Sequence, residues 1–226
     1  QQSSLANTLG KTLQQVKVSG SLKTQLNLHI PLSGKNIEVK GEVLLAENEV
    51  ELPNLNVLLE KTTGTVSFIN NKVMASGLQA QLLKQPIQLG LTGSKQNNGY
   101  QTDINIKGDW QATPLLGSFS EGLNKYLSGN SSWTADIALT LPTQGYEYSA
   151  QIFSNLTQLS SDLPAPFFKT SEQSLPLLIT SQGNEQASSI KVTLGQDVEF
   201  NGNLPHQDMQ FSRAHLAKGQ SDLMGM

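Results

Sequence analysis

Apolar and polar residues alternate along much of this chain, which is typical of β-strands with one apolar and one polar face. In the segment 100–106, for example, Ile104 and Ile106 alternate with Asp103 and Asn105. Comparable segments lie at 16–30, 37–43, 50–52, 55–59, 64–68, 73–75, 86–93, 133–141, 146–152, 177–180, 190–194 and 198–200. Short polar turns separate them, among them one predicted at Asn70-Asn71-Lys72. Consecutive strands joined in this way favour antiparallel pairing in a meander. We therefore predict a mainly β fold: an elongated, curled antiparallel sheet that forms a U-shaped groove.

A short phrase recurs within this pattern: an apolar residue, a polar residue, then glycine. It occurs at Val18-Ser19-Gly20, Val39-Lys40-Gly41, Leu91-Thr92-Gly93, Ile106-Lys107-Gly108 and Phe200-Asn201-Gly202, with a looser copy at Ala75-Ser76-Gly77. Glycine lets a backbone bend, bulge or reverse where a β-carbon would clash. The phrase therefore predicts a bend or a turn at the end of each strand.

One interior segment, residues 114–128, departs from the strand pattern and predicts a helix. Thr113 suits the N-cap, Pro114 the first helical position, and Gly129 the stop. Its apolar residues recur every four positions: Leu115, Phe119, Leu123 and Leu127.

Composition indicates one continuous segment over residues 1–226, and the polar stretch 95–99 is the one candidate sub-boundary. We interpret 95–99 as a hairpin tip rather than a flexible linker. Charged residues make up 15% of the chain and the net charge is −3, so nothing favours nucleic acid as a partner. The chain has no cysteine, which excludes a disulfide-stapled fold.

The residues with catalytic or metal-binding chemistry are sparse. His29, His206 and His215 lack the spacing of metal ligands, and His29 occupies the polar side of an alternating strand. The chain has no Gly-x-Ser-x-Gly nucleophile motif, and its carboxylates are scattered singly. We predict no catalytic residues, no metal and no cofactor, and therefore not an enzyme. The tryptophans and tyrosines at 100–148 close a core in one interpretation and bind a sugar or an acyl chain in another.

Several motifs in order resemble the AsmA-like envelope proteins, and in particular their YhdP branch. They are Gly64-Thr-Val-Ser-Phe68, Val73 to Leu82, Gln85-Pro86-Ile87-Gln-Leu89, Trp110 after Gly108, the predicted helix end Tyr126-Leu-Ser-Gly129, Trp133 to Pro142, Gly145-Tyr146, and Asp162-Leu-Pro-Ala-Pro166 with Lys169. Lys84 stands where this family commonly has glycine. The resemblance covers most of residues 16–216.

The resemblance implies a fragment of a much longer periplasmic protein, anchored to the inner membrane of a Gram-negative bacterium by a segment outside this one. It implies an apolar β groove that carries phospholipid acyl chains between the inner and outer membranes and so supports outer-membrane lipid homeostasis and the permeability barrier. Membrane contact would come from parts outside this segment, and envelope proteins are further candidate partners. The family offers no catalytic residues to transfer.

Ten apolar residues at alternating positions are our candidates for the lining of such a groove. They are Val66, Phe68, Ile87, Leu89, Leu91, Ile104, Ile106, Ile137, Leu139 and Leu141. Two alternatives stay open at this point. The same residues could form the core of a closed sandwich, with the helix at 114–128 plugging one end. The chain could also be a structural spacer or assembly scaffold in the periplasm that binds protein partners through its sheet edges.

Overall fold

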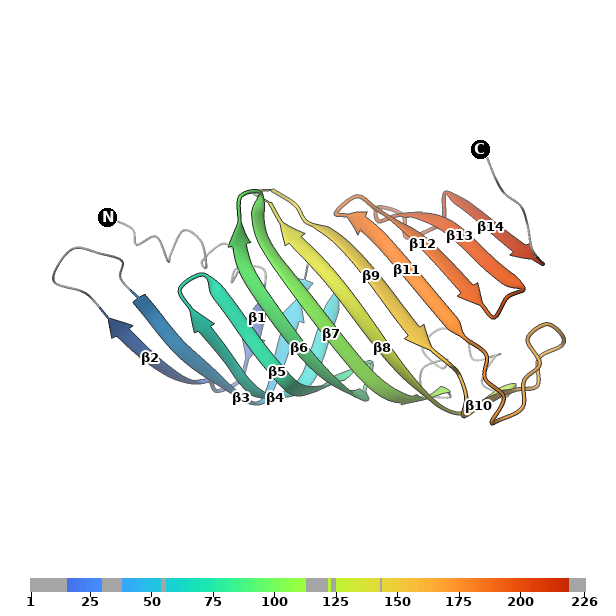
Figure 1. The fold of residues 1–226 in the computed structure, drawn as a ribbon, viewed down its shortest axis with the longest axis horizontal. Helices are drawn as coiled ribbons and strands as arrows, with labels where there is room; N and C mark the ends of the chain where they lie inside the picture. Colours follow the sequence, from blue (N-terminus) through green and yellow to red (C-terminus); the bar gives the residue numbers. More distant parts are fainter. Residues whose placement is uncertain are drawn as a thin grey trace. The chain divides into compact units, whose positions relative to one another are not determined.

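A computed structural model describes residues 16–29, 38–53, 56–112, 122, 125–142 and 144–219. Fourteen strands form one antiparallel sheet that does not close on itself (Figure 1). Along the sheet the order is β1-β3-β4-β5-β6-β7-β8-β9-β11-β12-β13-β14, while β2 also pairs with β3 and β10 pairs with β8. The predicted antiparallel meander is thus confirmed, and no second layer of strands exists among the described residues.

The strands differ widely in length, and the longest lie between β3 and β8. Their bounds are β1 Lys17–Ser19, β2 Lys23–His29, β3 Glu38–Leu52, β4 Val57–Ile69, β5 Lys72–Leu82, β6 Gln85–Gln96, β7 Gly99–Gln111, β8 Leu127–Leu141, β9 Glu147–Ser154, β10 Leu159–Ser161, β11 Leu177–Asn184, β12 Ala187–Leu194, β13 Val198–Pro205 and β14 Arg213–Lys218. The described residues contain no helix that is long and apolar enough to span a membrane.

The chain divides into two compact units. Unit 1 comprises residues 1–106 and 138–146, and unit 2 comprises 107–137 and 147–226. Most of the buried apolar side chains among the described residues belong to unit 1, for example Val39, Leu78 and Ile87. In the described part of unit 2 the buried apolar residues are Ala112 and Ala135. Since the described strands form a single layer, burial on one face of unit 1 means that its sheet bends over that face.

Bulges in three neighbouring strands account for this bending. The pairing registers of β3, β4 and β5 shift near Glu47, Lys61 and Gly77, and each of these residues has a positive φ angle. A bulge adds one residue to one strand, which increases the local twist and bends the strand. It also exchanges the faces on which the following side chains lie.

Asn48 fixes the bulge of β3 to the first two strands. Its side chain is only 1% exposed. The Oδ1 atom accepts a hydrogen bond from the Ala46 backbone N–H at 2.7 Å, and Nδ2 donates to the carbonyls of Ser19 and Ser21 at 3.0 and 3.2 Å. The buried side-chain amide of Asn48 therefore fixes the connection between β1 and β2 to strand β3.

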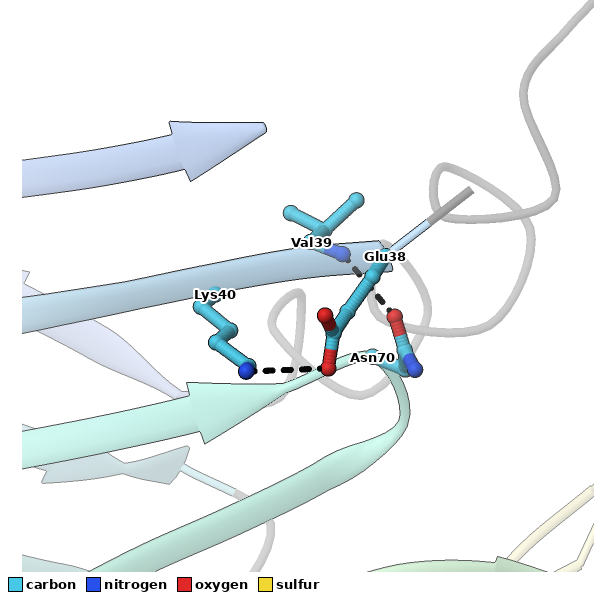
Figure 2. Close-up of polar contacts among 4 residues, drawn as sticks. All are labelled: Glu38, Val39, Lys40 and Asn70. Atoms are coloured by element: carbon cyan, nitrogen blue, oxygen red, sulfur yellow. Dashed lines mark hydrogen bonds and ion pairs between the residues drawn. The ribbon is translucent and has the colours of Figure 1, made fainter. Parts of the chain in front are cut away.

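The turn between β4 and β5 is tied to β3 by Asn70 (Figure 2). The Asn70 side chain accepts from the Val39 N–H at 2.9 Å, and the Asn70 N–H donates to the Val39 carbonyl at 2.8 Å. Lys40 and Glu38 form an ion pair beside it, with Nζ and Oε1 3.0 Å apart. Asn70 has φ of 51°, a conformation that asparagine tolerates better than most residues. The sequence-predicted turn at 70–72 is confirmed, as is the hairpin tip at 95–99 between β6 and β7.

The predicted helix at 114–128 falls largely outside the described residues, because 113–121, 123 and 124 are not among them. Its predicted end is wrong. Leu127 and Ser128 belong to β8, where Leu127 pairs with Ser161 and Ser128 with Ser160 of β10. Pairing with a distant strand outweighs the four-residue spacing of leucines at this position, as tertiary context often does.

The motif at 162–169 is held together by a buried lysine. Lys169 is 3% exposed, and its ammonium donates to the carbonyls of Leu159, Thr170 and Thr157 at 2.5, 3.1 and 3.5 Å. Burial lowers the pKa of Lys169. Its backbone also exchanges two hydrogen bonds with Ser161. The loop that precedes Lys169 is therefore closed at its base on β10.

Candidate functional site

One face of the sheet in unit 1 gathers five of the ten candidate residues. Residues that pair directly across neighbouring strands lie on the same face. Phe68 pairs with Gly41 and Val73, and Val66 pairs with Val43 and Ala75. The pairs Ala75–Leu91, Leu78–Leu89 and Ala80–Ile87 carry this face onward to β6. Val66, Phe68, Ile87, Leu89 and Leu91 therefore share one surface, which we call the apolar face of unit 1.

Strand β7 adds Ile104 and Ile106 to this face. A β-carbon added at Gly93, which pairs with Val73, would lie 2.7 Å from Cε1 of Tyr100, so the Tyr100 ring covers the apolar face. Exposed and less exposed residues alternate along β7 from Tyr100 onward. Ile104 and Ile106 follow Tyr100 at even spacings, so they lie on the same face of the strand as Tyr100. The Tyr100 hydroxyl is buried beside the Val73 backbone, and burial raises the pKa of the phenol.

The remaining candidates lie on β8. Leu139 and Leu141 belong to unit 1, and Ile137 belongs to unit 2. All three alternate along β8 in step with Trp133, so they lie on the same face of that strand. Within unit 2, Trp133 stacks edge to face on Trp110, with ring centroids 4.7 Å apart. The indole N–H of Trp133 is buried and has no acceptor among the described residues.

The candidate residues are covered unequally. Ile87, Leu89 and Leu139 are buried, at 4, 6 and 8% exposure. The other seven keep partial exposure: Val66, Phe68, Leu91, Ile104, Ile106, Ile137 and Leu141. The sheet is open, so these side chains are not the core of a closed sandwich formed by the described strands.

The structure corrects the interpretation of the recurrent glycines. Gly20 and Gly77 have positive φ angles at a turn and at a bulge, as expected. Gly41, Gly93, Gly108 and Gly202 instead lie within strands β3, β6, β7 and β13, and each is covered by an aromatic ring. The covering residues are Phe68, Tyr100, Trp133 and Phe211, in that order. Glycine is needed there because a side chain would occupy the space of the ring, an arrangement known to rescue glycine in sheets.

Replacing Gly108 by valine should displace both tryptophans of the chain. A β-carbon at this position would lie 2.7 and 2.9 Å from two atoms of Trp133 and 3.0 Å from Nε1 of Trp110. Overpacking of this kind costs about 1–3 kcal/mol of unfolding free energy. Because Trp110 and Trp133 are the two tryptophans of the sequence, a shift in intrinsic fluorescence reports this site directly.

A double-mutant cycle provides the control for Gly108. In a Trp133→Ala background the ring is absent, so the same Gly108→Val change should cost less than half as much in urea unfolding. An equal cost in both backgrounds would mean that the glycine serves the strand and not the ring.

Sequence reasoning missed the apolar face of unit 2. Pairing registers place Ile152, Ile179 and Val192 opposite one another on β9, β11 and β12, and Phe200 of β13 lies opposite Val192. All four are partly exposed. Leu216 of β14 pairs with Phe200 and is 65% exposed, so this face is less covered than that of unit 1. The alternation of apolar and polar residues in 146–152 and 190–194 indicates this apolar face, but none of the ten candidate residues lies beyond β8.

The described histidines do not form a metal centre. Among the described residues, no group of three or more His, Asp or Glu side chains could hold a metal ion. His29 is exposed on the face opposite the one that contains Val39, as predicted for the polar side of its strand. His206 hydrogen-bonds to Ser188, whereas His215 pairs with Asn201 on the opposite face of the sheet. Ordinary surface chemistry appears at Glu199, whose pKa is lowered by hydrogen bonds from Lys191 and Asn201.

Comparisons with known proteins identify the family of this chain. The family model described as YhdP protein matches residues 1–224. The chain is 30% identical over 221 residues to a protein of Escherichia coli (strain K12) named intermembrane phospholipid transporter YhdP. The match covers 97% of this chain and 17% of that relative, so the chain spans about a sixth of the relative's length. No solved structure matches. The family match over nearly the whole chain shows that it belongs to the YhdP family.

Proposed function

We propose that this chain is one segment of a conduit for phospholipid acyl chains, and that the apolar face of each unit contacts them. The observation that carries the proposal is the partial exposure of apolar side chains on one face of an open sheet. A contiguous apolar face that the polypeptide leaves uncovered marks a site for a protein partner, a membrane or an apolar ligand. The name of the Escherichia coli relative supplies the chemistry of that occupant, a phospholipid.

The seven partly exposed candidate residues act as a lining and not as a capture site, and the buried Ile87, Leu89 and Leu139 support them from below. Each methylene removed from water contributes about 0.8 kcal/mol, so about ten methylenes on this surface give several kcal/mol after the entropy of binding is subtracted. Contacts of this kind have no direction, which permits an acyl chain to slide along the face. The segment performs no chemical reaction. It acts in the periplasm between the two membranes, as part of a protein whose membrane anchor lies elsewhere.

Extraction of the purified chain with organic solvent, followed by mass spectrometry, tests the proposal. We expect phospholipid to be recovered, and a photo-crosslinkable phospholipid to label peptides from β4, β6 and β7. A chain that emerges free of lipid and takes up no labelled lipid would contradict the proposal. The spacer function considered from the sequence predicts that second outcome.

A further inference from the structure

A row of polar side chains crosses the largely apolar face of unit 2, which also carries Ser154 and Lys218. Tyr148 of β9, Ser181 of β11 and Ser188 of β12 lie on the same face as Ile152, Ile179 and Ile190, as their pairing registers require. His206, which follows β13, completes the row through its contact with Ser188. We call Tyr148, Ser181, Ser188 and His206 the polar row.

Continuous hydrogen bonds join the four side chains. Tyr148 Oη lies 2.8 Å from Ser181 Oγ and 2.6 Å from Ser188 Oγ, and Ser188 Oγ lies 2.7 Å from His206 Nε2. His206 Nδ1 lies 3.1 Å from the Glu185 carbonyl, which can only accept a hydrogen bond. With Nδ1–H donating there, Nε2 accepts from Ser188, Ser188 from Tyr148, and Tyr148 from Ser181.

The backbone is shaped to allow this row. Gly183 pairs with both Tyr148 and Ser188 and lies between them on β11. A β-carbon on Gly183 would lie 3.0 Å from Ser188 Oγ and closer still to the backbone of β12. The phenol of Tyr148 therefore reaches across β11 to Ser188 because no side chain intervenes. His206 is held from the other side, since its backbone N–H donates to the Gln186 carbonyl at 2.8 Å.

The polar row marks one end of an apolar lane. On β12 the residues after Ser188 that share its face are Ile190, Val192 and Leu194. From Ile190 to Leu194 the strand rises about 13 Å at about 3.3 Å per residue. One leaflet of a bilayer has about 15 Å of hydrocarbon, half of about 30 Å. The lane thus has the length of an acyl chain, with hydroxyl and imidazole groups at one end.

We propose that the polar row binds the ester and phosphate oxygens of a phospholipid whose acyl chains lie along the apolar face of unit 2. The inference rests on the proposed function and adds a place and an orientation for the headgroup region. Tyr148, Ser181 and His206 are partly exposed, so a ligand can reach them. The row contains no carboxylate, so none of its side chains repels the negative charge of a phosphate. The hydroxyl hydrogens can rotate from one another toward a ligand, which gives up to three donors.

Histidine resonances of the whole chain provide the test. The chain has three histidines, and His29 and His215 lie on the face opposite the apolar side chains, so they are internal controls. Ring-labelled protein is titrated with dioctanoyl phosphatidylglycerol below its micellar concentration, with dioctanoylglycerol, and with inorganic phosphate. We expect the His206 ring signals to move with the phospholipid, to move at least threefold less with dioctanoylglycerol or phosphate alone, and the other two histidines to stay.

Two variants test the contribution of the polar row to lipid binding separately from that of the apolar lane. Ser188→Ala and Tyr148→Phe should each reduce the preference for phosphatidylglycerol over dioctanoylglycerol at least fivefold while dioctanoylglycerol affinity stays within twofold. Ser189→Ala, on the opposite exposed face of β12, is the matched control and should change neither value. Thermal unfolding of each variant establishes that it folds, and Tyr148→Phe keeps the ring in place if Ser188→Ala is unstable.

Three outcomes overturn the inference, and they differ in what else they reject. If the variants keep the wild-type lipid preference and the His206 ring signals do not move with phospholipid, the polar row only links neighbouring strands. The conduit proposal then stands. A His206 response to inorganic phosphate equal to that for phospholipid means a free-phosphate site. A wild-type chain that binds neither lipid removes the proposed function as well.

Discussion

Replacing Ile106 by aspartate is expected to lower phospholipid loading of the chain about thirtyfold. Ile106 is partly exposed on the apolar face of unit 1. A carboxylate keeps its hydration shell, so two or three methylenes of a lipid at this position lose their contact. At about 0.8 kcal/mol each, the loss is about 2 kcal/mol, which corresponds to about thirtyfold in affinity. Quantitative mass spectrometry of extracted lipid, or titration with a fluorescent phospholipid, measures it.

Asn105→Asp is the matched control for Ile106→Asp. Asn105 precedes Ile106 on β7, is exposed, and lies on the opposite face, so the variant introduces the same charge on the same strand without touching the lining. Its lipid loading should stay within twofold of the wild-type value. Circular dichroism and thermal unfolding must show that both variants fold. Equal loading by Ile106→Asp and the wild type would exclude this stretch of β7 from the path.

Asn48→Leu is expected to lower the free energy of unfolding by about 3 kcal/mol. Leucine is similar in size but leaves the Ala46 N–H and the carbonyls of Ser19 and Ser21 without the partners that Asn48 provides. Each buried polar group that loses its partner costs about 1–3 kcal/mol, and water reaches some of these groups in part. Urea unfolding followed by circular dichroism gives the difference.

Hydrogen exchange locates the effect of Asn48. Because Asn48 holds Ser19 and Ser21, amides of β1 should lose more protection than those of β6. Asn27→Leu serves as the control, since Asn27 is exposed on β2 and its replacement should change the unfolding free energy by about 0.5 kcal/mol or less. A loss below 1 kcal/mol for Asn48→Leu would show that water satisfies these groups as well as the amide does.

Features that depend on neighbours in sequence could be predicted from the chain alone. The meander, the turn at Asn70 and the tip at 95–99 are local, and the alternation of β7 is uninterrupted. The face of β5 on which Ala75 and Leu78 both lie could not be predicted in this way. They share a face although three positions separate them, because the bulge at Gly77 intervenes. Bulges depend on how two strands pair, and no local pattern reports them.

The site contains contacts that join distant residues, and these were the hardest to foresee. Gly41 lies beneath Phe68, 27 positions away, and its role becomes visible only in the paired register. Ser188 and His206 each look like ordinary strand and turn residues until the sheet brings them together with Tyr148. The candidate lining residues could be chosen from the sequence because apolarity on one face is a property of single strands.

Nearly every strand of this protein pairs with the strand that precedes or follows it in the chain. Most strands therefore depend on their immediate neighbours in the chain, and a hairpin can be gained or lost without changing how the other strands pair. The length of a sheet of this kind can thus change by whole hairpins, with no redesign of the strands already present.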